Sequence, residues 1–273
     1  MDPRLQRRIQ RYGWDKASAD YERSWLRQLE PAHAKLLATA GLGPGERVLD
    51  VACGTGLVTF AAAAAVGPRG TVVGVDLSDG MVERCRARAR ERGLGHVRVE
   101  RMEAEVLALP DASFDAALCA LGLMYVPDAR KALAEMRRVL APGGRAVAAV
   151  WGQRSRCGWA EIFPIVDARV KSEVCPLFFS LGTADRLGTI FRDVGLANVV
   201  TEKLETRLEW ASPEEACGAA FAGGPVALAY SRFDEATRQA VHAEYLASIA
   251  PWRSGSGYAV PGEFVVVAGR RPD

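Results

Sequence analysis

The sequence predicts an α/β fold built on a doubly wound parallel sheet, with a final antiparallel hairpin and a helical lid. Strand-like and helix-like segments alternate from about residue 31 to residue 152, which is the pattern of repeated βαβ units. Within this region a run of branched apolar residues at 48–51 stops at a glycine-rich turn, and a helical pattern follows. The last two strand-like segments, 199–210 and 264–269, are separated by a long helical stretch. We therefore expect them to form an antiparallel hairpin whose connection has grown into a lid.

Each expected strand is a short run of apolar and β-branched residues that ends at turn residues. The expected strands are 47–51, 71–75, 97–101, 114–119, 145–151, 199–210 and 264–269. Each expected helix shows apolar spacing of three and four residues or an alanine-rich composition. The expected helices are 31–40, 59–66, 79–92, 129–140, 157–171, 184–194 and 233–249. The turns between a helix and the next strand are G-L-G-P-G-E (41–46), G-P-R-G (67–70) and A-P-G-G (141–144).

The domain organisation follows from these elements. A chain of 273 residues, 49% of them hydrophobic, can bury one large core. We expect an N-terminal helical cap (1–40), a ligand-binding α/β core (41–152) and a remainder (153–273). The remainder completes the sheet and carries the lid at about 153–180 and 212–260.

Charge and cysteine content argue against several classes of function. The 35 basic and 33 acidic residues leave a net charge of +2, so no overall field favours nucleic acid or an anionic membrane. The six cysteines form no C-x-x-C pair, which indicates reduced thiols and no metal site. The N-terminus lacks an apolar signal segment, and no window approaches the length of a membrane span. We expect a cytoplasmic protein that binds neither nucleic acid nor a membrane.

The glycine-rich turn after the first strand is expected to hold a ligand. Backbone N–H groups at such a turn can approach a ligand closely. A dinucleotide fingerprint would need a third glycine at Thr59, and the lysine of a P-loop is absent. Asp76, at the end of the second strand and 20 residues after Gly56, is placed to accept hydrogen bonds from ribose hydroxyls. Alternatively Asp76 caps the next helix, although Ser78 or Asp79 suits that role better.

Four sequence blocks, in this order and spacing, resemble the class I S-adenosylmethionine-dependent methyltransferases. The blocks are V-L-D-V-A-C-G-T-G (48–56), V-V-G-V-D-L-S-D-G-M (72–81), L-P-D-A-S-F-D-A-A-L-C (109–119) and R-V-L-A-P-G-G-R (138–145). Within that class they are most similar to the ubiquinone/menaquinone-biosynthesis C-methyltransferases, which carry a methyltransferase type 11 domain. The resemblance covers about residues 45–152 and implies a Rossmann-like, seven-stranded methyltransferase sheet with S-adenosyl-L-methionine as cofactor. No segment after Trp151 matches the quinone-specific part of those enzymes, so the resemblance implies a reaction but no acceptor.

The resemblance also implies which residues bind the cofactor. Asp50, Gly54 and Gly56 would surround its methionine part, and Asp76 would bind the ribose hydroxyls. Glu103 stands where the family commonly has the aspartate of G-D-A-E, near the adenine amino group. The full set implied is Tyr21, Asp50, Ala52, Gly54, Gly56, Asp76, Leu77, Met81, Glu103, Ala104 and Cys119.

Few side chains are candidates for acid–base catalysis. In-line displacement of a methyl group from a sulfonium disperses a charge that the cofactor already carries, so positioning can supply most of the acceleration. A general base is needed only for acceptors such as a carbon acid, a phenol or an ammonium. Tyr125, where the family faces the acceptor, and His242, in the expected lid helix, are the catalytic candidates; a core tyrosine and a solvent-facing histidine are the alternatives. His33 and His96 are expected to be structural or surface residues.

Aromatic residues are concentrated outside the expected core. Residues 41–150 contain three, whereas residues 151–262 contain thirteen. Either the lid has a core of its own, or its rings line an apolar acceptor pocket; the candidates are Trp159, Phe163, Phe178, Phe179, Phe221 and Tyr230. A second aromatic group in the cap either folds over the cofactor or docks as an amphipathic helix on the sheet; it comprises Tyr12, Trp14, Tyr21 and Trp25.

The leading hypothesis is an S-adenosylmethionine-dependent methyltransferase that transfers a methyl group to a small, apolar or aromatic acceptor. A nicotinamide-dependent dehydrogenase shares the fold but would need the missing third glycine. A catalytically silent S-adenosylmethionine-binding protein and a methyltransferase with a macromolecular acceptor are further alternatives. A metalloid acceptor bound by Cys157, Cys175 and Cys217 is another, although their spacing is not that of a ligand set.

Overall fold

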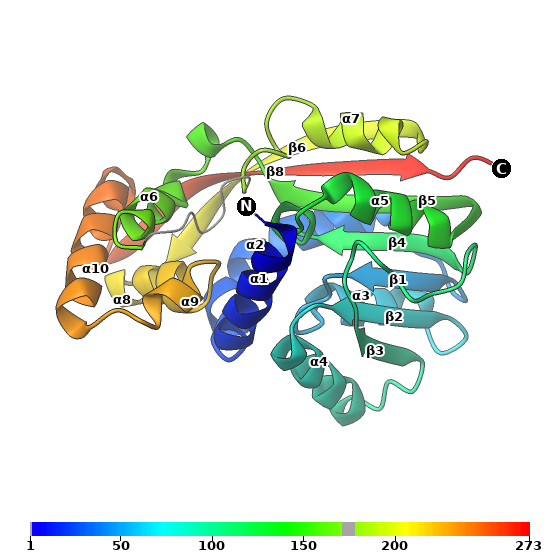
Figure 1. Ribbon diagram of the computed structural model, residues 1–273, viewed down its shortest axis with the longest axis horizontal. Coiled ribbons are helices and arrows are strands. Elements are labelled where there is room, and N and C mark those ends of the chain that lie inside the picture. The colour runs from blue at the N-terminus through cyan, green and yellow to red at the C-terminus, as the bar shows by residue number, and fades with distance from the viewer. Residues whose placement is uncertain (1, 171–177) are drawn as a thin grey trace.

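The computed structural model describes residues 2–170 and 178–273 of the chain. Its strands are β1 (Arg47–Val51), β2 (Thr71–Asp76), β3 (Val97–Arg101), β4 (Phe114–Ala120), β5 (Leu140–Trp151), β6 (Ala197–Trp210), β7 (Arg253–Ser254) and β8 (Gly257–Arg270). They form one sheet of order β3-β2-β1-β4-β5-β8-β6, and the short β7 pairs with β8 outside this order (Figure 1). β1 to β5 are parallel, whereas β8 lies antiparallel between β5 and β6. The predicted fold class, with its final antiparallel hairpin, is confirmed.

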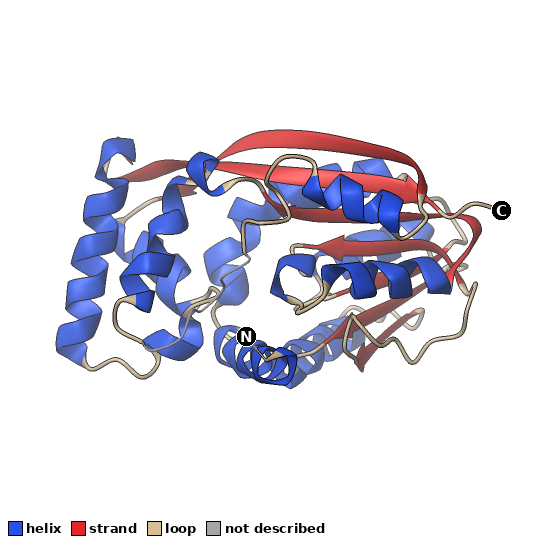
Figure 2. Ribbon diagram, turned by 45° about the horizontal axis from the view of Figure 1, so that its top comes forward, coloured by secondary structure: helices blue, strands red, loops and turns tan. Residues whose placement is uncertain are grey.

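Helices lie on both sides of this sheet (Figure 2). The α-helices are α1 (Pro3–Ala17), α2 (Tyr21–Ala40), α3 (Leu57–Val66), α4 (Asp79–Glu91), α5 (Ala129–Val139), α6 (Ile162–Asp167), α7 (Arg186–Asp193), α8 (Pro213–Cys217), α9 (Ala227–Tyr230) and α10 (Glu235–Ile249). Shorter helical segments are η1 (Leu123–Tyr125), η2 (Arg154–Arg156), η3 (Gly158–Glu161), η4 (Gly218–Ala222) and η5 (Ala250–Trp252). Helices α6, α8, α9 and α10 gather beyond one end of the sheet, at the left of Figure 1.

Helix α2 is longer than predicted. It begins at Tyr21 and continues through Pro31, where the sequence pattern places the start of a helix. A proline inside a helix costs about 3 kcal/mol or more. One face of α2 buries Trp25, Leu29 and Leu36, on both sides of the proline, and burying each large apolar side chain contributes about 1.5–3 kcal/mol. The prediction was wrong because the apolar stripe extends upstream of Pro31 and its burial offsets the cost.

The last two strands are also longer than predicted. β8 begins at Gly257 instead of Phe264 because it stays paired with β6 as far as Tyr258, which lies opposite Trp210. β5 pairs with β8 only as far as Phe264. β6 and β8 therefore continue beyond the rest of the sheet as a two-stranded ribbon, and the insertion that connects them packs at its end.

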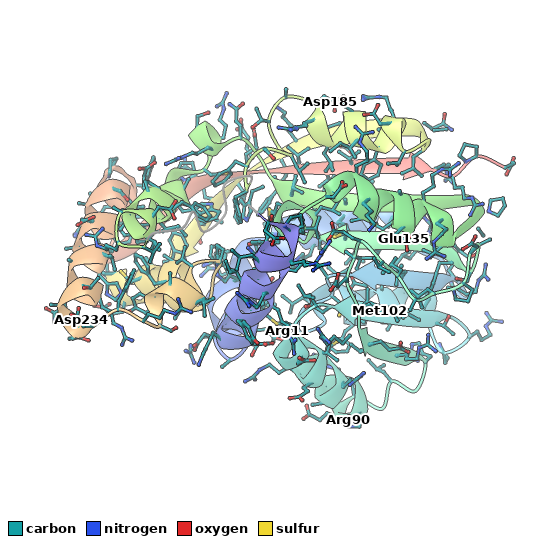
Figure 3. All side chains as sticks on the ribbon, in the orientation of Figure 1. Arg11, Arg90, Met102, Glu135, Asp185 and Asp234 are labelled. Carbon is teal, nitrogen blue, oxygen red and sulfur yellow. The ribbon has the colours of Figure 1, made fainter. Side chains whose placement is uncertain are left out.

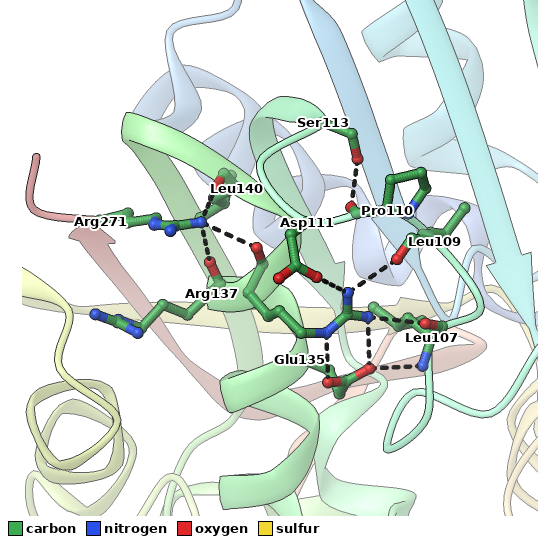
Figure 4. Close-up of polar contacts among 10 residues, drawn as sticks. Leu107, Leu109, Pro110, Asp111, Ser113, Glu135, Arg137, Leu140 and Arg271 are labelled. Carbon is green, nitrogen blue, oxygen red and sulfur yellow. Dashed lines mark hydrogen bonds and ion pairs between the residues drawn. The ribbon is translucent and has the colours of Figure 1, made fainter.

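A polar network fixes the segment that follows β3 (Figure 4). Arg138 of α5 donates to the backbone oxygens of Leu107 and Leu109 at 2.8 and 2.9 Å and pairs with Glu135 at 2.8 Å. Glu135 also accepts a hydrogen bond from the Leu107 N–H at 2.8 Å. The Arg138 hydrogen bond is the main cause of the lowered pKa of Glu135. The network holds the segment 102–113 against α5, beside the pocket described below.

None of the helices within the described residues is both long enough and apolar enough to cross a membrane.

Candidate functional site

A pocket lies at the carboxyl ends of the parallel strands, beneath helices α1 and α2. Parallel strands end at the same edge of a sheet, and ligands of doubly wound folds bind at that edge. One part of the pocket wall comes from the loops that follow β1, β2, β3 and β4. The other part comes from α1, α2, η1, η3, the end of β5 and residues 224–225 of the insertion.

The loop after β1 exposes its backbone to the pocket at Gly54. Gly54 has a φ of 55° and lines the pocket, and a Cβ built there meets no atom within 4 Å. Gly56 is different, because a Cβ there would lie 2.5 Å from the Phe60 ring and 2.7 Å from the Cys85 sulfur. Gly54 therefore leaves room for a ligand, whereas Gly56 leaves room for the packing of α3 and α4 beneath the loop. The predicted contact of Gly56 with the cofactor does not fit this placement.

Two residues with strained backbones stand at the ends of adjacent strands. Ala52 follows β1 with a φ of 57°, and Leu121 follows the neighbouring strand β4 with a φ of 61°. Both line the pocket. Positive φ is uncommon in residues other than glycine, and such strain clusters at functional sites. Here it turns the chain sharply at two adjacent strand ends and opens the space between them.

Asp50, at the end of β1, lies beneath the loop and outside the pocket wall. Its side chain is buried, and the Thr59 hydroxyl donates to Oδ2 at 2.6 Å. Oδ1 has no hydrogen-bond partner among the described residues. Burial raises the pKa of Asp50 to about 7. A buried carboxylate oxygen without a partner suits a cationic group bound above the loop, such as the ammonium of the methionine part of the cofactor.

Asp76, at the end of β2, braces the glycine loop and lines the pocket. Oδ2 accepts from the Gly54 N–H and Oδ1 from the Ser78 N–H, both at 2.9 Å. Burial raises its pKa, and these backbone hydrogen bonds act in the opposite direction. Ser78 caps α4, since its hydroxyl accepts from the Met81 N–H at 3.1 Å. Asp76 is therefore free of the capping role, and its carboxylate has lone pairs left for ribose hydroxyls.

The pocket beyond Asp76 has the apolar walls that a flat ring needs. It is lined there by Leu77, Met81, Met102, Glu103 and Ala104. The carboxylate of Glu103 lies 3.2 Å from Nε of Arg7, and the same nitrogen donates to Glu105 at 2.8 Å. Glu105 is buried and also accepts from the Asp128 N–H at 3.1 Å. Glu103, predicted near the adenine amino group, is therefore held at the pocket by a residue of α1.

Helix α1 is tied to the start of α4 and forms a wall of the pocket. Oδ1 of Asp15 accepts from the Ser78 hydroxyl at 2.6 Å and from the Gly80 N–H at 3.0 Å. Arg11, labelled on α1 in Figure 3, pairs with Asp79. Three of the four aromatic residues in the predicted cap cluster line the pocket, namely Trp14, Tyr21 and Trp25; Tyr12 is 51% exposed. The cap therefore contributes rings to the pocket as well as burying apolar surface.

The pocket becomes aromatic at Tyr125. The ring of Tyr125 meets those of Trp14 and Phe178 edge to face, with centroids 5.0 and 5.4 Å apart. Trp25, Trp151 and Trp159 contact one another at centroid distances between 4.8 and 6.2 Å. The wall of this end contains no charged side chain within the described part of the chain; it is formed by Trp25, Met124, Tyr125, Trp151, Trp159, Gly224 and Pro225. Such a surface favours an uncharged, flat ligand.

Three residues predicted at the site, Cys119, Phe163 and Phe179, do not line this pocket wall. Cys119 is buried in β4, where burial raises its pKa to about 12. The backbone of Gly122 occupies the wall in its place. Phe163 and Phe179 pack around Trp159, with ring centroids 5.9 and 5.8 Å from that of Trp159, and so help to hold the Trp159 ring in the pocket wall.

His242 of α10 lies in a second pocket, contrary to its prediction as a catalytic residue. Its Nε2 is hydrogen-bonded to the Tyr230 hydroxyl at 3.0 Å, and the two rings stack at 5.7 Å with 16° between their planes. Phe221 stacks on Tyr230 at 5.3 Å, and Cys217 also lines this second pocket. Burial lowers the pKa of His242. None of these residues lines the first pocket, so Phe221 and Tyr230 fit the alternative in which the lid has a core of its own.

The other predicted histidines and cysteines lie away from the first pocket. Burial in α2 lowers the pKa of His33 to about 4, and Nε2 of His96 lies 3.2 Å from the Ala63 carbonyl oxygen. Cys157 and Cys217 are buried in different places, and Cys175 falls outside the described residues. No group of three metal-ligating side chains is found in residues 2–170 and 178–273.

Several wall residues were missed by the prediction from sequence. Arg7 and Gln10 line the pocket from the same face of α1 as the predicted Trp14, and the spacing of three and four residues is a helical signal that could have identified them. Glu105 stands in the block compared with G-D-A-E. Gly224 and Pro225 carry no comparable signal, because only the path of the insertion brings them to the pocket.

Comparison with known proteins finds a methyltransferase domain within this chain and a similar fold among solved structures. Residues 48–144 match the family described as "Methyltransferase domain". The YcgJ protein of Bacillus subtilis has a similar fold, with a TM-score of 0.62 and 20% identity over 89% of this chain and 99% of that one. The predicted resemblance to the class I S-adenosylmethionine-dependent methyltransferases is confirmed.

Two curated relatives give the resemblance more detail. The demethylmenaquinone methyltransferase of Geobacillus kaustophilus is 36% identical over 155 residues, which are 55% of this chain and 66% of that protein. The aklanonic acid methyltransferase DauC of Streptomyces sp. (strain C5) is 38% identical over 132 residues, 48% of this chain and 60% of the relative. The chain thus resembles the ubiquinone/menaquinone-biosynthesis group, and the matched stretches span less than two thirds of these relatives.

Proposed function

We propose that this protein is an S-adenosylmethionine-dependent methyltransferase whose acceptor is a small, uncharged, apolar or aromatic molecule. The observation that carries this proposal is the two-part pocket. Its strand-end part holds Gly54, Asp76 and Glu103, and in its other part the described wall residues are mostly aromatic and carry no charge. The two parts adjoin at Tyr125, so a cofactor and an acceptor can meet within one pocket.

The cofactor would be bound by the residues around the strand ends. Gly54 offers open space beside its backbone, and Asp76 offers a carboxylate to the ribose. The unpartnered Oδ1 of Asp50 suits the ammonium group. When bound, S-adenosylmethionine would supply an electrophilic methyl group on a sulfonium. The residues of this chain need only hold the donor and acceptor in line and exclude water, which can be worth roughly 7 to 11 kcal/mol of the barrier.

The acceptor end of the pocket limits what can be methylated. A charged acceptor would lose its hydration against Trp25, Trp151 and Trp159 without gaining an ionic partner from the described residues of this wall. A flat, neutral ring can instead pack against them. The relatives named for demethylmenaquinone and aklanonic acid are consistent with a small-molecule acceptor. Tyr125 is the side chain we propose as base where the acceptor must lose a proton.

The domain division follows from the same pocket. We propose that residues 1–40 cap the cofactor, that residues 41–152 bind it, and that residues 153–273 supply the rest of the acceptor wall. The ring of Trp159 and the backbone at 224–225 are the described parts of that last region that reach the pocket.

Titration calorimetry with S-adenosylmethionine, S-adenosylhomocysteine and NAD tests the cofactor. Binding of the first two and not of NAD is expected; binding of NAD alone would support a dehydrogenase. Transfer of a radiolabelled methyl group to a panel of phenols, quinols and amines tests the activity. If the protein binds the cofactor but transfers a methyl group neither to any compound of the panel nor to any component of a cell extract, the catalytically silent alternative would replace our proposal.

A further inference from the structure

Strand β6 forms an edge of the sheet, at the end of the strand order opposite β3 (Figures 1 and 2). It is 14 residues long and contains no proline. Edge strands carry unpaired backbone N–H and C=O groups, and proteins usually protect them by short length, proline, bulges or charges. A long edge of this kind is able to pair with another strand unless its side chains prevent it.

The exposed side chains of β6 have alternating charge. Lys203, Glu205 and Arg207 are exposed and occupy alternate positions, so they share one face of the strand. Glu202 and Glu209 of the same strand pair with Lys35 and Arg27 of α2. Lys203 and Glu205 have no ion-pair partner among the residues that the structure describes. A single sign would repel a second copy of the strand, whereas alternating signs do not.

A particular register makes β6 complementary to itself. Suppose that two copies of β6 pair antiparallel with their Leu204 residues opposite each other. The numbers of any two residues that face each other across the pair then add up to 408. Lys203 then faces Glu205 of the second copy, and symmetry repeats this pair on the other side. On the opposite face the two Leu204 side chains, which are half-buried in their own chains, meet. This register gives both charged groups a partner.

We propose that β6 is a self-association edge through which two copies of this chain join their sheets in an antiparallel pair centred on Leu204. The alternative register centred on Thr206 places Glu205 opposite Arg207, whose guanidinium already donates to the Ala259 carbonyl oxygen at 3.3 Å, and places Lys203 opposite Glu209. That residue is already engaged, because its side chain pairs with Arg27 and its carbonyl oxygen accepts from the Gln28 side chain at 2.7 Å. The proposed pairing lies at the opposite end of the strand order from β1 and β2 and does not depend on the function of the pocket.

Sedimentation equilibrium of the full chain over a range of concentrations tests this edge. The wild type is expected to form a dimer. Lys203→Glu and Glu205→Lys each place like charges opposite one another twice per dimer and should weaken association about tenfold or more. The double variant Lys203→Glu/Glu205→Lys restores opposite charges and should return association to near the wild-type level. Arg84→Glu, on the exposed face of α4, is the matched control and should leave association unchanged.

The result that would overturn the proposal is a wild type that stays monomeric at the highest concentration reached. A dimer that is insensitive to both single reversals would overturn it as well, because association would then use another surface. Circular dichroism of each variant shows whether its fold is retained. Should a charge variant fail to fold, Lys203→Gln replaces it, since removing the charge opposite Glu205 of the second copy should also weaken the dimer.

Discussion

Two aromatic groups with similar composition have different surroundings in this molecule. The group around Trp159 lies against the strand-end pocket and joins it to the rings of the cap. The group around His242 is stacked within the insertion and faces a separate pocket. Both come from the region rich in aromatic residues. Ring content therefore predicts that a segment packs, but the chain path decides which rings meet a ligand.

The contrast also separates what the sequence could predict from what it could not. β1 and β3 have the predicted bounds, and Asp76 lies at the pocket, because apolar runs and strand ends are local signals. The placement of His242 and Gly224 depends on how the insertion folds back on α2, for which there is no local pattern. Gly54 and Gly56 show the same limit at short range: both have positive φ, yet only one faces open space.

The largest expected effect distinguishes these two glycines. Gly54→Val should abolish detectable binding of S-adenosylhomocysteine in a folded protein, because the branched side chain would enter the open space of the pocket and its φ is unfavourable. Gly56→Val should instead destabilise or unfold the protein, because its Cβ would overlap Phe60 and Cys85. Calorimetry and thermal unfolding of both variants separate the two outcomes. Normal binding by folded Gly54→Val would show that the ligand does not approach this loop.

A smaller effect is expected at Asp76. Asp76→Ala should weaken S-adenosylmethionine and S-adenosylhomocysteine alike, because both carry the same ribose. The expected loss for a charge-assisted hydrogen bond is about 1.5–3 kcal/mol, or roughly ten- to a hundredfold in affinity. Asp76→Asn keeps the size and one acceptor oxygen and is the matched control; it should lose less. An effect on one ligand only would contradict the ribose role.

The buried Asp50 predicts a pH dependence of stability. Burial raises its pKa from 3.8 to about 7, so between these values the folded protein binds a proton that the unfolded chain releases. The free energy of unfolding contributed by Asp50 should therefore fall as pH rises through this window, by a few kcal/mol at most. His33 has the opposite effect: burial lowers its pKa from 6.5 to about 4, so its contribution to the free energy of unfolding rises with pH between these two values.

The comparison of Asp50→Asn with the wild type isolates this contribution, since His33 is common to both. Urea unfolding at several pH values should show the difference between the two proteins changing steadily between pH about 4 and about 7. A difference that stays constant across this range would mean that Asp50 is ionised throughout.

The smallest effect is expected in the second pocket. His242→Gln should lower the free energy of unfolding by about 1 kcal/mol through loss of the Tyr230 hydrogen bond. It should leave cofactor affinity and methyl transfer unchanged, because His242 does not line the first pocket. Tyr230→Phe breaks the same hydrogen bond and should behave alike. A strong loss of transfer in both variants, with unchanged stability, would restore His242 as a catalytic candidate.

Hydrogen–deuterium exchange of the full chain with and without S-adenosylhomocysteine tests the central claim most directly, because it reports on both pockets at once. The account predicts ligand-dependent protection at residues 52–56, 76–81 and 102–105, and in α1, whose contacts with Ser78, Gly80 and Glu105 hold it over the site. Helix α10, around His242, should exchange equally in both samples. Protection centred on α10, with none at the strand-end loops, would contradict the assignment of the cofactor to the first pocket.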